Sequence, residues 1–162
     1  MYSRSTILVV DDEEIVKKKL KDAMSAEFDI IDASNGKEAL ELLEAKSGRI
    51  SVVLLDLIMP VMDGFQFMNE FRKHQEYSNI PVIVATANDD WHSEQKCLEA
   101  GVWDFVMKPY NPVLLQFRIR NAIEKSRHNS YRPRCERYSP SVAHWVFEPP
   151  YQYRSSARLT LT

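Results

Sequence analysis

The sequence predicts an α/β domain with a single doubly wound sheet of five parallel strands and helices on both faces. Short apolar runs alternate with amphipathic helical patterns from residue 7 onward, which is typical of successive βαβ units. Most of these runs are rich in β-branched residues, as expected for strands that are buried on both faces. The composition, with 44% apolar and 27% charged residues, is that of a globular protein and excludes disorder throughout.

Five apolar runs are expected to form the strands, because each is bounded by polar or turn-forming residues. In chain order these runs are 7–10, 28–33, 52–55, 82–85 and 104–107. The third run leads directly into Asp56, and Pro81 precedes the fourth. Parallel neighbours are joined by right-handed crossovers, so we expect a helix in each gap.

Five helical patterns fill the gaps and follow the last run. Val16, Leu20 and Ala23 recur at i, i+4 and i+7 and predict the buried face of the first helix, with the lysines from 17 to 21 in solvent. Phe67 and Phe71 mark the third helix. The other patterns are Ala39, Leu40, Leu42 and Leu43 after Asn35-Gly36, residues 91–100 before Gly101, and Leu115, Ile119 and Ala122 after Pro112.

Polar side chains follow four of the five predicted strands: Asp11 and Asp12 the first, Asp56 the third, Thr86 the fourth and Lys108 the fifth. Each residue alone has an ordinary structural explanation. Asp11 and Asp12 are equally typical of a helix N-cap, Asp56 is typical of a turn, Thr86 of a strand and Lys108 of a solvated loop. Ligands of doubly wound sheets bind beyond the carboxyl ends of the strands, so we expect these side chains to meet there. The carboxylates would repel one another unless a cation or a raised pKa relieved them, and Mg²⁺ is the simplest such cation. The sequence therefore predicts a phosphoryl-binding pocket with an aspartate as nucleophile.

The charge distribution argues against direct binding of nucleic acid. Residues 1–127 carry 16 Lys and Arg against 21 Asp and Glu, a net charge of −5, whereas residues 128–162 carry 5 against 2, or +3. Phosphate binding needs a basic face. Cys97 and Cys135 lack partners at metal-ligand spacing, and no apolar run approaches the ~20 residues of a membrane span. We expect a soluble, unexported protein of the reducing cytoplasm that does not associate with membranes.

Four segments resemble, in order and spacing, the receiver domain of two-component response regulators. They are 7–13, 54–60 with 62–64, 81–87 and 101–109. The resemblance covers about residues 5–127 and implies a flavodoxin-like sheet with strand order 2-1-3-4-5. It also implies a phosphorylation-controlled signalling switch that catalyses only its own phosphorylation and dephosphorylation.

The resemblance gives the pocket residues individual roles. Asp56 matches the phosphoacceptor, Lys108 the lysine that pairs with the phosphoryl oxygens, and Thr86 the hydroxyl that moves toward them. The implied cofactor is Mg²⁺, bound directly by Asp12, by Asp56 and by the backbone carbonyl of Ile58, and by Asp11 through a water molecule.

Further positions carry over from the same family. Phe105 matches a switch aromatic, and the Lys108-Pro109 peptide bond is typically cis in the family. The side chains of Ile58, Ala87 and Asn88 would flank the approach to the phosphorus atom. We expect Ile58 to shield the phosphoryl group from water and to prolong the life of the phosphorylated form.

The implied phosphodonor is a sensor histidine kinase or a histidine phosphotransfer protein. The outward residues Ile15 and Lys19 of the first helix are its expected contacts. Output is expected on the face formed by the fourth helix, the fifth strand and the fifth helix, toward an unidentified partner or a second copy of the chain. Trp91, Trp103 and Tyr110 lie near this face, either packed over helix ends or as part of a partner site.

Residues 128–162 form a segment of different composition. They hold four of the eight prolines and six of the seventeen aromatic residues, without a sustained periodic pattern. We expect a disordered or loosely attached tail, or an altered C-terminus that replaces a lost output domain. A segment that folds on binding, anchored by Trp145 and Phe147, is a third alternative.

Two other classes of function remain open at this stage. A Mg²⁺-dependent phosphatase or phosphotransferase for small molecules generally carries its nucleophile after the first strand, in a spaced Asp-x-Asp pair. Here Asp11 and Asp12 are adjacent, and the better nucleophile follows the third strand. A receiver that serves as a constitutive binding module is the other alternative, and the intact set of pocket residues argues against it.

Overall fold

The computed structural model describes residues 4–46, 48–87 and 101–128. All of them belong to the first of the two units into which the chain divides, Met1–Tyr131. The helix expected at 91–100 and the segment from residue 129 onward lie outside the described residues.

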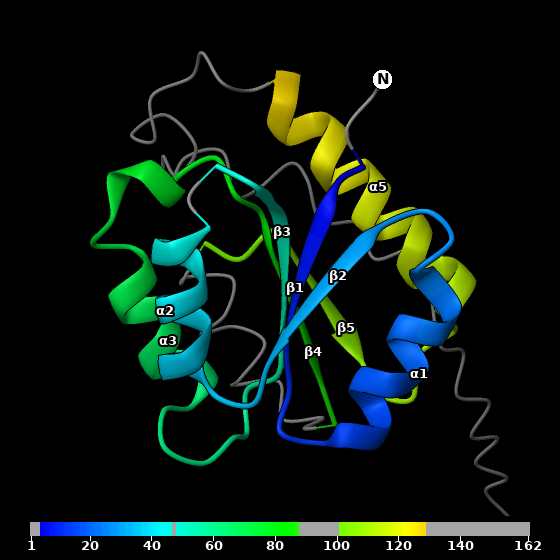
Figure 1. Cartoon of the computed structure of the whole chain (residues 1–162), viewed down its shortest axis with the longest axis horizontal. Coiled ribbons are helices and arrows are strands. Elements are labelled where there is room, and N and C mark those ends of the chain that lie inside the picture. The colour runs from blue at the N-terminus through cyan, green and yellow to red at the C-terminus, as the bar shows by residue number, and fades with distance from the viewer. Residues whose placement is uncertain (1–3, 47, 88–100, 129–162) are drawn as a thin grey trace, which may run out of the picture. The chain divides into compact units, whose positions relative to one another are not determined.

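A parallel five-stranded sheet forms the centre of the described unit, in the order β2-β1-β3-β4-β5 (Figure 1). Its strands are β1 (Thr6–Val10), β2 (Asp29–Ala33), β3 (Ile50–Leu55), β4 (Val82–Thr86) and β5 (Asp104–Met107). The predicted fold class and strand order are confirmed. Because β1 and β3 are central neighbours, their carboxyl ends lie side by side, with Val10 paired to Leu55.

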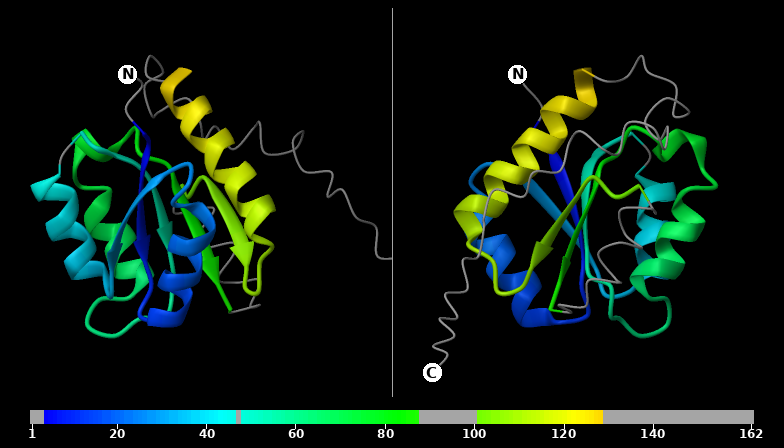
Figure 2. Two further views of the ribbon diagram at one scale, coloured as in Figure 1. Left: turned by 45° about the vertical axis from the view of Figure 1, so that its right-hand side comes forward. Right: turned by 180° about the vertical axis from the view of Figure 1, so that it is seen from behind.

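Helices cover both faces of the sheet (Figures 1 and 2). On one face lie α1 (Glu14–Met24) and α5 (Pro112–His128), and on the other lie α2 (Gly36–Ala45) and α3 (Gly64–Phe71), which a 3-10 turn (Gln75–Tyr77) follows. The strand pleat divides the core accordingly. In β1, Leu8 and Val10 pack with the α2 and α3 side chains, and Ile7 and Val9 pack with those of α1 and α5.

The buried face of α1 differs from the predicted one. Leu20 is buried as expected, but Met24 takes the place predicted for Ala23, which is exposed. Lys17, predicted in solvent, is buried as well. Lys17, Leu20 and Met24 are spaced i, i+3 and i+7, so they form an equally regular helical face. The larger Met24 side chain fills more of the space beneath α5 than the methyl group of Ala23 would.

The inward residues predicted for α5 are confirmed, since Leu115, Ile119 and Ala122 are all buried. Within the described ranges, no helix has both the length and the apolar composition needed to cross a membrane.

Candidate functional site

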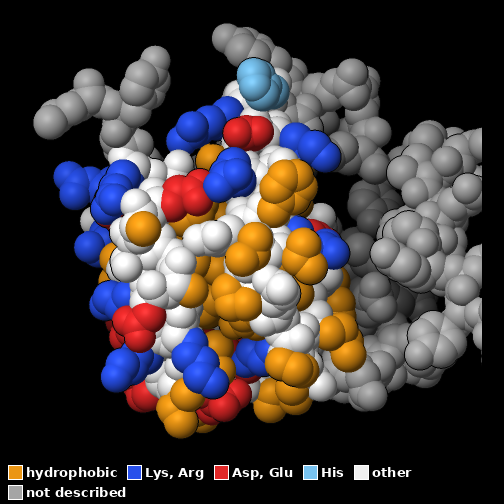
Figure 3. Space-filling model, turned by 90° about the vertical axis from the view of Figure 1, so that its right-hand side faces the viewer, with side chains coloured by type: hydrophobic (Ala, Val, Ile, Leu, Met, Phe, Trp, Pro, Cys, Tyr) orange, Lys and Arg blue, Asp and Glu red, His pale blue; other side chains and the backbone are white. Residues whose placement is uncertain are grey.

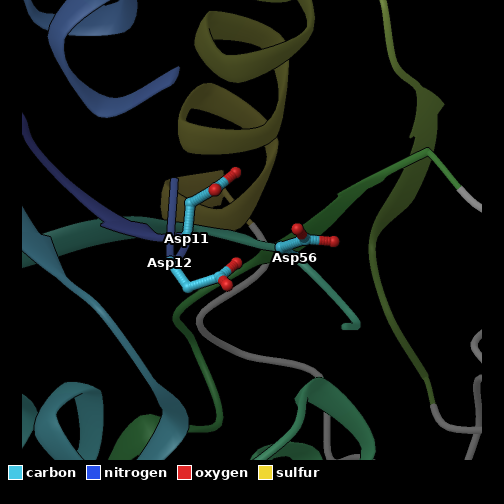
Figure 4. Close-up of side chains that lie close together, drawn as sticks. All are labelled: Asp11, Asp12 and Asp56. Carbon is cyan, nitrogen blue, oxygen red and sulfur yellow. The ribbon is translucent and has the colours of Figure 1, made fainter. Parts of the chain in front are cut away.

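Three carboxylates converge where β1 and β3 end (Figure 4). Asp11 and Asp12 follow β1, and Asp56 follows β3. One carboxylate oxygen from each residue lies within 4.8 Å of the other two. Asp11 and Asp56 are buried, with 3% and 7% of their surface exposed, whereas Asp12 is open to solvent. The three side chains therefore form an acidic cluster that could hold a metal ion and that opens to solvent at Asp12.

Lys108 bridges the two buried carboxylates from the end of β5. Its Nζ atom lies 2.6 Å from Asp11 Oδ2 and 3.0 Å from Asp56 Oδ2, and Glu13 Oε1 lies 3.7 Å away. The backbone N–H of Lys108 donates to the carbonyl of Thr86 at 2.9 Å, which fixes the chain at this point. The Lys108-Pro109 bond is cis, as the family resemblance implied.

Backbone amides hold the remaining oxygens of the buried carboxylates. Leu57 N–H donates to Asp56 Oδ1 at 2.7 Å, and Glu13 N–H donates to Asp11 Oδ1 at 2.9 Å. Both carboxylates are therefore bonded on one oxygen to the backbone and on the other to Lys108. This arrangement fixes their orientation before any ligand binds.

Burial and charge compete at this cluster. Burial raises the pKa of Asp11, and its hydrogen bond to Lys108 opposes the increase only in part. Burial also lowers the pKa of Lys108, but its hydrogen bonds and charge interactions with Asp11 and Asp56 outweigh this effect and leave the pKa raised. Lys108 is therefore an ammonium ion at neutral pH and acts as the resident cation of the cluster.

The predicted switch residues lie on one face of the sheet. Val82 and Val84 point into the core beside α2 and α3, and the strand alternation places the fully buried Thr86 on the same side. Phe105 pairs with Val84 across β4 and β5, and its half-buried ring packs against the same core. Thr86 and Phe105 are therefore diagonal neighbours on adjacent strands.

The other predicted residues are placed as follows. Ile58 lies in the loop after β3 with 64% of its surface exposed, Ala87 is exposed after β4, and Asn88 lies outside the described residues. Trp103 and Tyr110 pack against the core beneath α1 and α5, which favours the packing alternative for both, and Trp91 is not described. Burial raises the pKa of Tyr110 to about 12. Ile15 and Lys19 are exposed on α1, as expected.

A groove of about 370 Å³ runs between α1 and the segment that follows β5, and it reaches the acidic cluster at Lys108. Its lining includes Val16, Lys19 and Leu20 of α1 together with Pro109, Tyr110 and Pro112. The groove is continuous with the outward face of α1 where Lys19 lies.

Two residues near the cluster were not predicted from the sequence. Glu13 is a third acidic neighbour of Lys108, and its place directly after Asp12 was the available signal. Lys17 is buried beside β2, and the signal was its i, i+3, i+7 spacing with Leu20 and Met24. A charged residue in such a pattern is normally expected to be exposed, so the sequence pattern predicted Lys17 in solvent.

The fold and the site define a doubly wound α/β protein with an acidic, lysine-bridged site at the carboxyl edge of its sheet. The family model described as the response regulator receiver domain matches residues 7–120, and the chain belongs to this family. Receiver domains are signalling switches that accept phosphoryl groups from kinases.

Curated relatives share about a third of their matched residues with this chain. The probable transcriptional regulator ycf27 of Porphyridium aerugineum is 36% identical over 123 residues, which are 75% of this chain and 49% of that protein. The transcriptional regulatory protein SrrA of Staphylococcus aureus is 35% identical over 121 residues, 74% of this chain and 48% of SrrA. The chain thus spans about half the length of these relatives.

Solved structures show the same fold. A response regulator receiver domain from Clostridium thermocellum has a TM-score of 0.71 at 26% identity, covering 76% of this chain and 98% of that one. A CheY-like receiver domain protein from Methanospirillum hungatei JF-1 has a TM-score of 0.72 at 23% identity, covering 78% and 99%.

Proposed function

We propose that this chain is a receiver that accepts a phosphoryl group on Asp56. The observation that carries the proposal is the surroundings of this side chain. It is a buried carboxylate with a lysine ammonium 3.0 Å away and two further carboxylates close enough to share a cation. A nucleophilic carboxylate that receives an anionic group needs such nearby positive charge.

The donor set fits a hard divalent cation, and we propose Mg²⁺. Asp12 and Asp56 would bind it directly, Asp11 through a water molecule, and the backbone carbonyl of Ile58 would supply a further oxygen. Oxygen ligands with retained waters suit Mg²⁺, and the exposed side of the cluster at Asp12 gives it access. When bound, the ion neutralises the carboxylates and draws phosphoryl oxygens toward them.

The proposed reaction is an in-line displacement at phosphorus. An oxygen of Asp56 forms the new P–O bond as the P–N bond of a phosphohistidine breaks, and the released imidazole nitrogen takes its proton from water. The product is an acyl phosphate on Asp56. The ammonium of Lys108 pairs with the new phosphoryl oxygens, since it already lies beside the acceptor carboxylate.

We propose that the phosphodonor, a sensor histidine kinase or a histidine phosphotransfer protein, docks along α1. Exposed Ile15 and Lys19 lie on this helix, and the groove beside it leads to Lys108. An apolar anchor at Ile15 and a groove that ends at the acceptor site suit a helical partner that presents one side chain.

We propose that output follows movement of the Thr86 hydroxyl toward the phosphoryl group and a turn of Phe105 into the space beside it. The diagonal placement of the two residues on β4 and β5 supports this coupling. The response would reach the face of β5 and α5, where Met107, Val113, Leu114 and Phe117 are exposed. Figure 3 shows hydrophobic side chains gathered on this side of the molecule, which suits an output partner or a second copy.

We place this switch in the cytoplasm, with no direct contact to nucleic acid or membrane. The net negative charge of residues 1–127 argues against direct binding of nucleic acid. The transcriptional regulators ycf27 and SrrA are longer proteins, and this chain matches about half of each.

The test is mass spectrometry after incubation with acetyl phosphate and Mg²⁺. The wild type should gain one phosphoryl mass and Asp56→Asn none. Asp63→Asn is the matched control, because Asp63 caps α3 in the same loop and asparagine caps equally well. Phosphorylation of Asp56→Asn at the wild-type level would refute the assignment.

A further inference from the structure

We infer that Lys17 is a positioning residue for Asp12, an inference that rests on the metal site proposed above. Lys17 lies in the first turns of α1 with only 5% of its surface exposed. Lysine is almost never buried to this extent unless its ammonium is paired. The hydrogen-bond and ion-pair partners of Lys17 therefore indicate the role of its buried ammonium.

The ammonium of Lys17 ties α1 to the end of β2. Its Nζ donates to Ser34 Oγ at 2.7 Å, pairs with Glu14 one turn earlier, and lies 4.0 Å from Asp32 Oδ2. Ser34 directly follows β2. The contact thus joins the start of α1 to the strand next to β1.

The loop that carries Asp12 is attached to this strand end at two points. The backbone N–H of Asp11 donates to the carbonyl of Ala33 at 3.0 Å, and Lys17 reaches the next residue, Ser34. Asp12 lies between these attachments and is exposed. Asp11 and Asp56 are held through their own carboxylates, whereas Asp12 depends on the backbone of this short loop for its place.

The strand end is in turn fixed against the loop that carries Asp56. Gly36 N–H donates to the carbonyl of Met62 at 2.9 Å. A Cβ atom at Gly36 would lie 2.7 Å from Met62 Cγ and 2.9 Å from Phe67 Cβ, so the two segments pack without room for a side chain. The Lys17 contact therefore sets the position of Asp12 relative to Asp56, which is the spacing that a shared cation requires.

The direction of the change in cation affinity on removal of the Lys17 ammonium distinguishes a positioning role from a purely electrostatic one. Lys17 is a cation on the helix that follows Asp12, so by Coulomb's law its removal alone should strengthen cation binding at the cluster or leave it unchanged. Loss of a positioning contact should weaken it instead. Lys17→Met keeps the buried aliphatic stem and removes the ammonium, and its former partner Glu14 is exposed, so the fold should persist.

The test measures Mn²⁺ affinity by electron paramagnetic resonance of the unbound ion, since Mn²⁺ takes the same oxygen ligands as Mg²⁺. Lys17→Met should raise the dissociation constant about tenfold, the lower end of the effect of residues that orient a metal ligand. Lys18→Met, the exposed neighbour on the same helix, should leave it unchanged or lower it. Ser34→Ala, which removes the hydroxyl partner without a charge change, should act in the same direction as Lys17→Met.

A double variant tests the route through Asp12. In an Asp12→Asn background, Lys17→Met should have no further effect on Mn²⁺ affinity. Binding by Lys17→Met as tight as by Lys18→Met would overturn the inference, and so would a lowered unfolding midpoint with unchanged affinity. Absence of Mn²⁺ binding by the wild type would instead refute the metal site itself. If Lys17→Met does not fold, Ser34→Ala decides by the same criteria.

Discussion

Replacing Lys108 by methionine tests how far one ammonium stabilises the acidic cluster. The change keeps most of the aliphatic side chain but removes the cation that lies 2.6 Å from Asp11 and 3.0 Å from Asp56. Both carboxylates are buried, and removing one partner of a buried ion pair typically costs about 3–5 kcal/mol. Protonation of Asp11, whose pKa burial already raises, limits the loss. We expect a decrease of ~3 kcal/mol in the free energy of unfolding at about pH 8 in EDTA.

The assay is urea unfolding followed by circular dichroism, with Lys73→Met as the control. Lys73 is exposed and pairs with Glu70 at 2.8 Å on the surface, so its loss should cost under ~1 kcal/mol. Asp11 opposes folding when it is charged, because its folded-state pKa is raised. Its protonation on acidification therefore relieves the variant, and the deficit of Lys108→Met should shrink toward about pH 5. A deficit no larger than that of Lys73→Met, or one that grows on acidification, would refute the reasoning.

Three other predictions concern the loops around the site. Val61 is β-branched, 78% exposed and has a φ of 69°, a backbone conformation that asparagine tolerates better than valine. Val61→Asn should therefore raise the free energy of unfolding, measured in urea, by about 1 kcal/mol. An unchanged value would show that the valine is not strained. Burial raises the pKa of Tyr110 to about 12. Above about pH 10 the phenol ionises in the unfolded chain but stays neutral in the fold, so the urea midpoint should fall between about pH 10 and 12. The fall should be smaller in Tyr110→Phe, and an equal fall in both proteins would refute this role for Tyr110. Ile58→Asn should speed loss of the phosphoryl group about threefold to thirtyfold, a barrier change of about 1–2 kcal/mol, because asparagine can orient a water molecule that isoleucine excludes. Mass spectrometry at a fixed Mg²⁺ concentration measures the decay, and equal rates in both proteins would show that Ile58 plays no part.

The sequence predicted the strands and most of the cluster because both depend on local pattern. An apolar run that stops at Asp11, at Asp56 or before Lys108 marks a strand end, and the parallel topology then brings those ends together. Strand bounds differ by one or two residues, as where β3 begins at Ile50 instead of Val52. Such ends depend on hydrogen bonds to neighbouring strands, which the run itself does not encode.

The same reasoning from local pattern could not predict that Lys17 is buried. Its spacing with Leu20 and Met24 is as regular as that of Val16 with Leu20 and Ala23, so the pattern alone does not choose between the two faces. The choice depends on Ser34 and Asp32, which offer the ammonium its partners from another part of the chain. Burial of a charge is decided by tertiary contacts, and here it reverses the ordinary preference of lysine for solvent.

The charge balance of the cluster connects its stability with its proposed chemistry. The ammonium of Lys108 donates hydrogen bonds to the two buried carboxylates, whereas Asp12 lies on the solvent side, where cations can reach it. A divalent ion held by this cluster would supply the positive charge that Lys108 now provides to Asp56, and it would weaken the attraction between the ammonium and Asp56. The proposed phosphorylation would convert Asp56 from a carboxylate into an acyl phosphate with more negative charge, which would again favour Lys108 beside it. In the proposed reaction Lys108 would therefore have a strong partner at residue 56 both before ion binding and after transfer. Its interaction would be weakest in the ion-bound state that precedes phosphorylation.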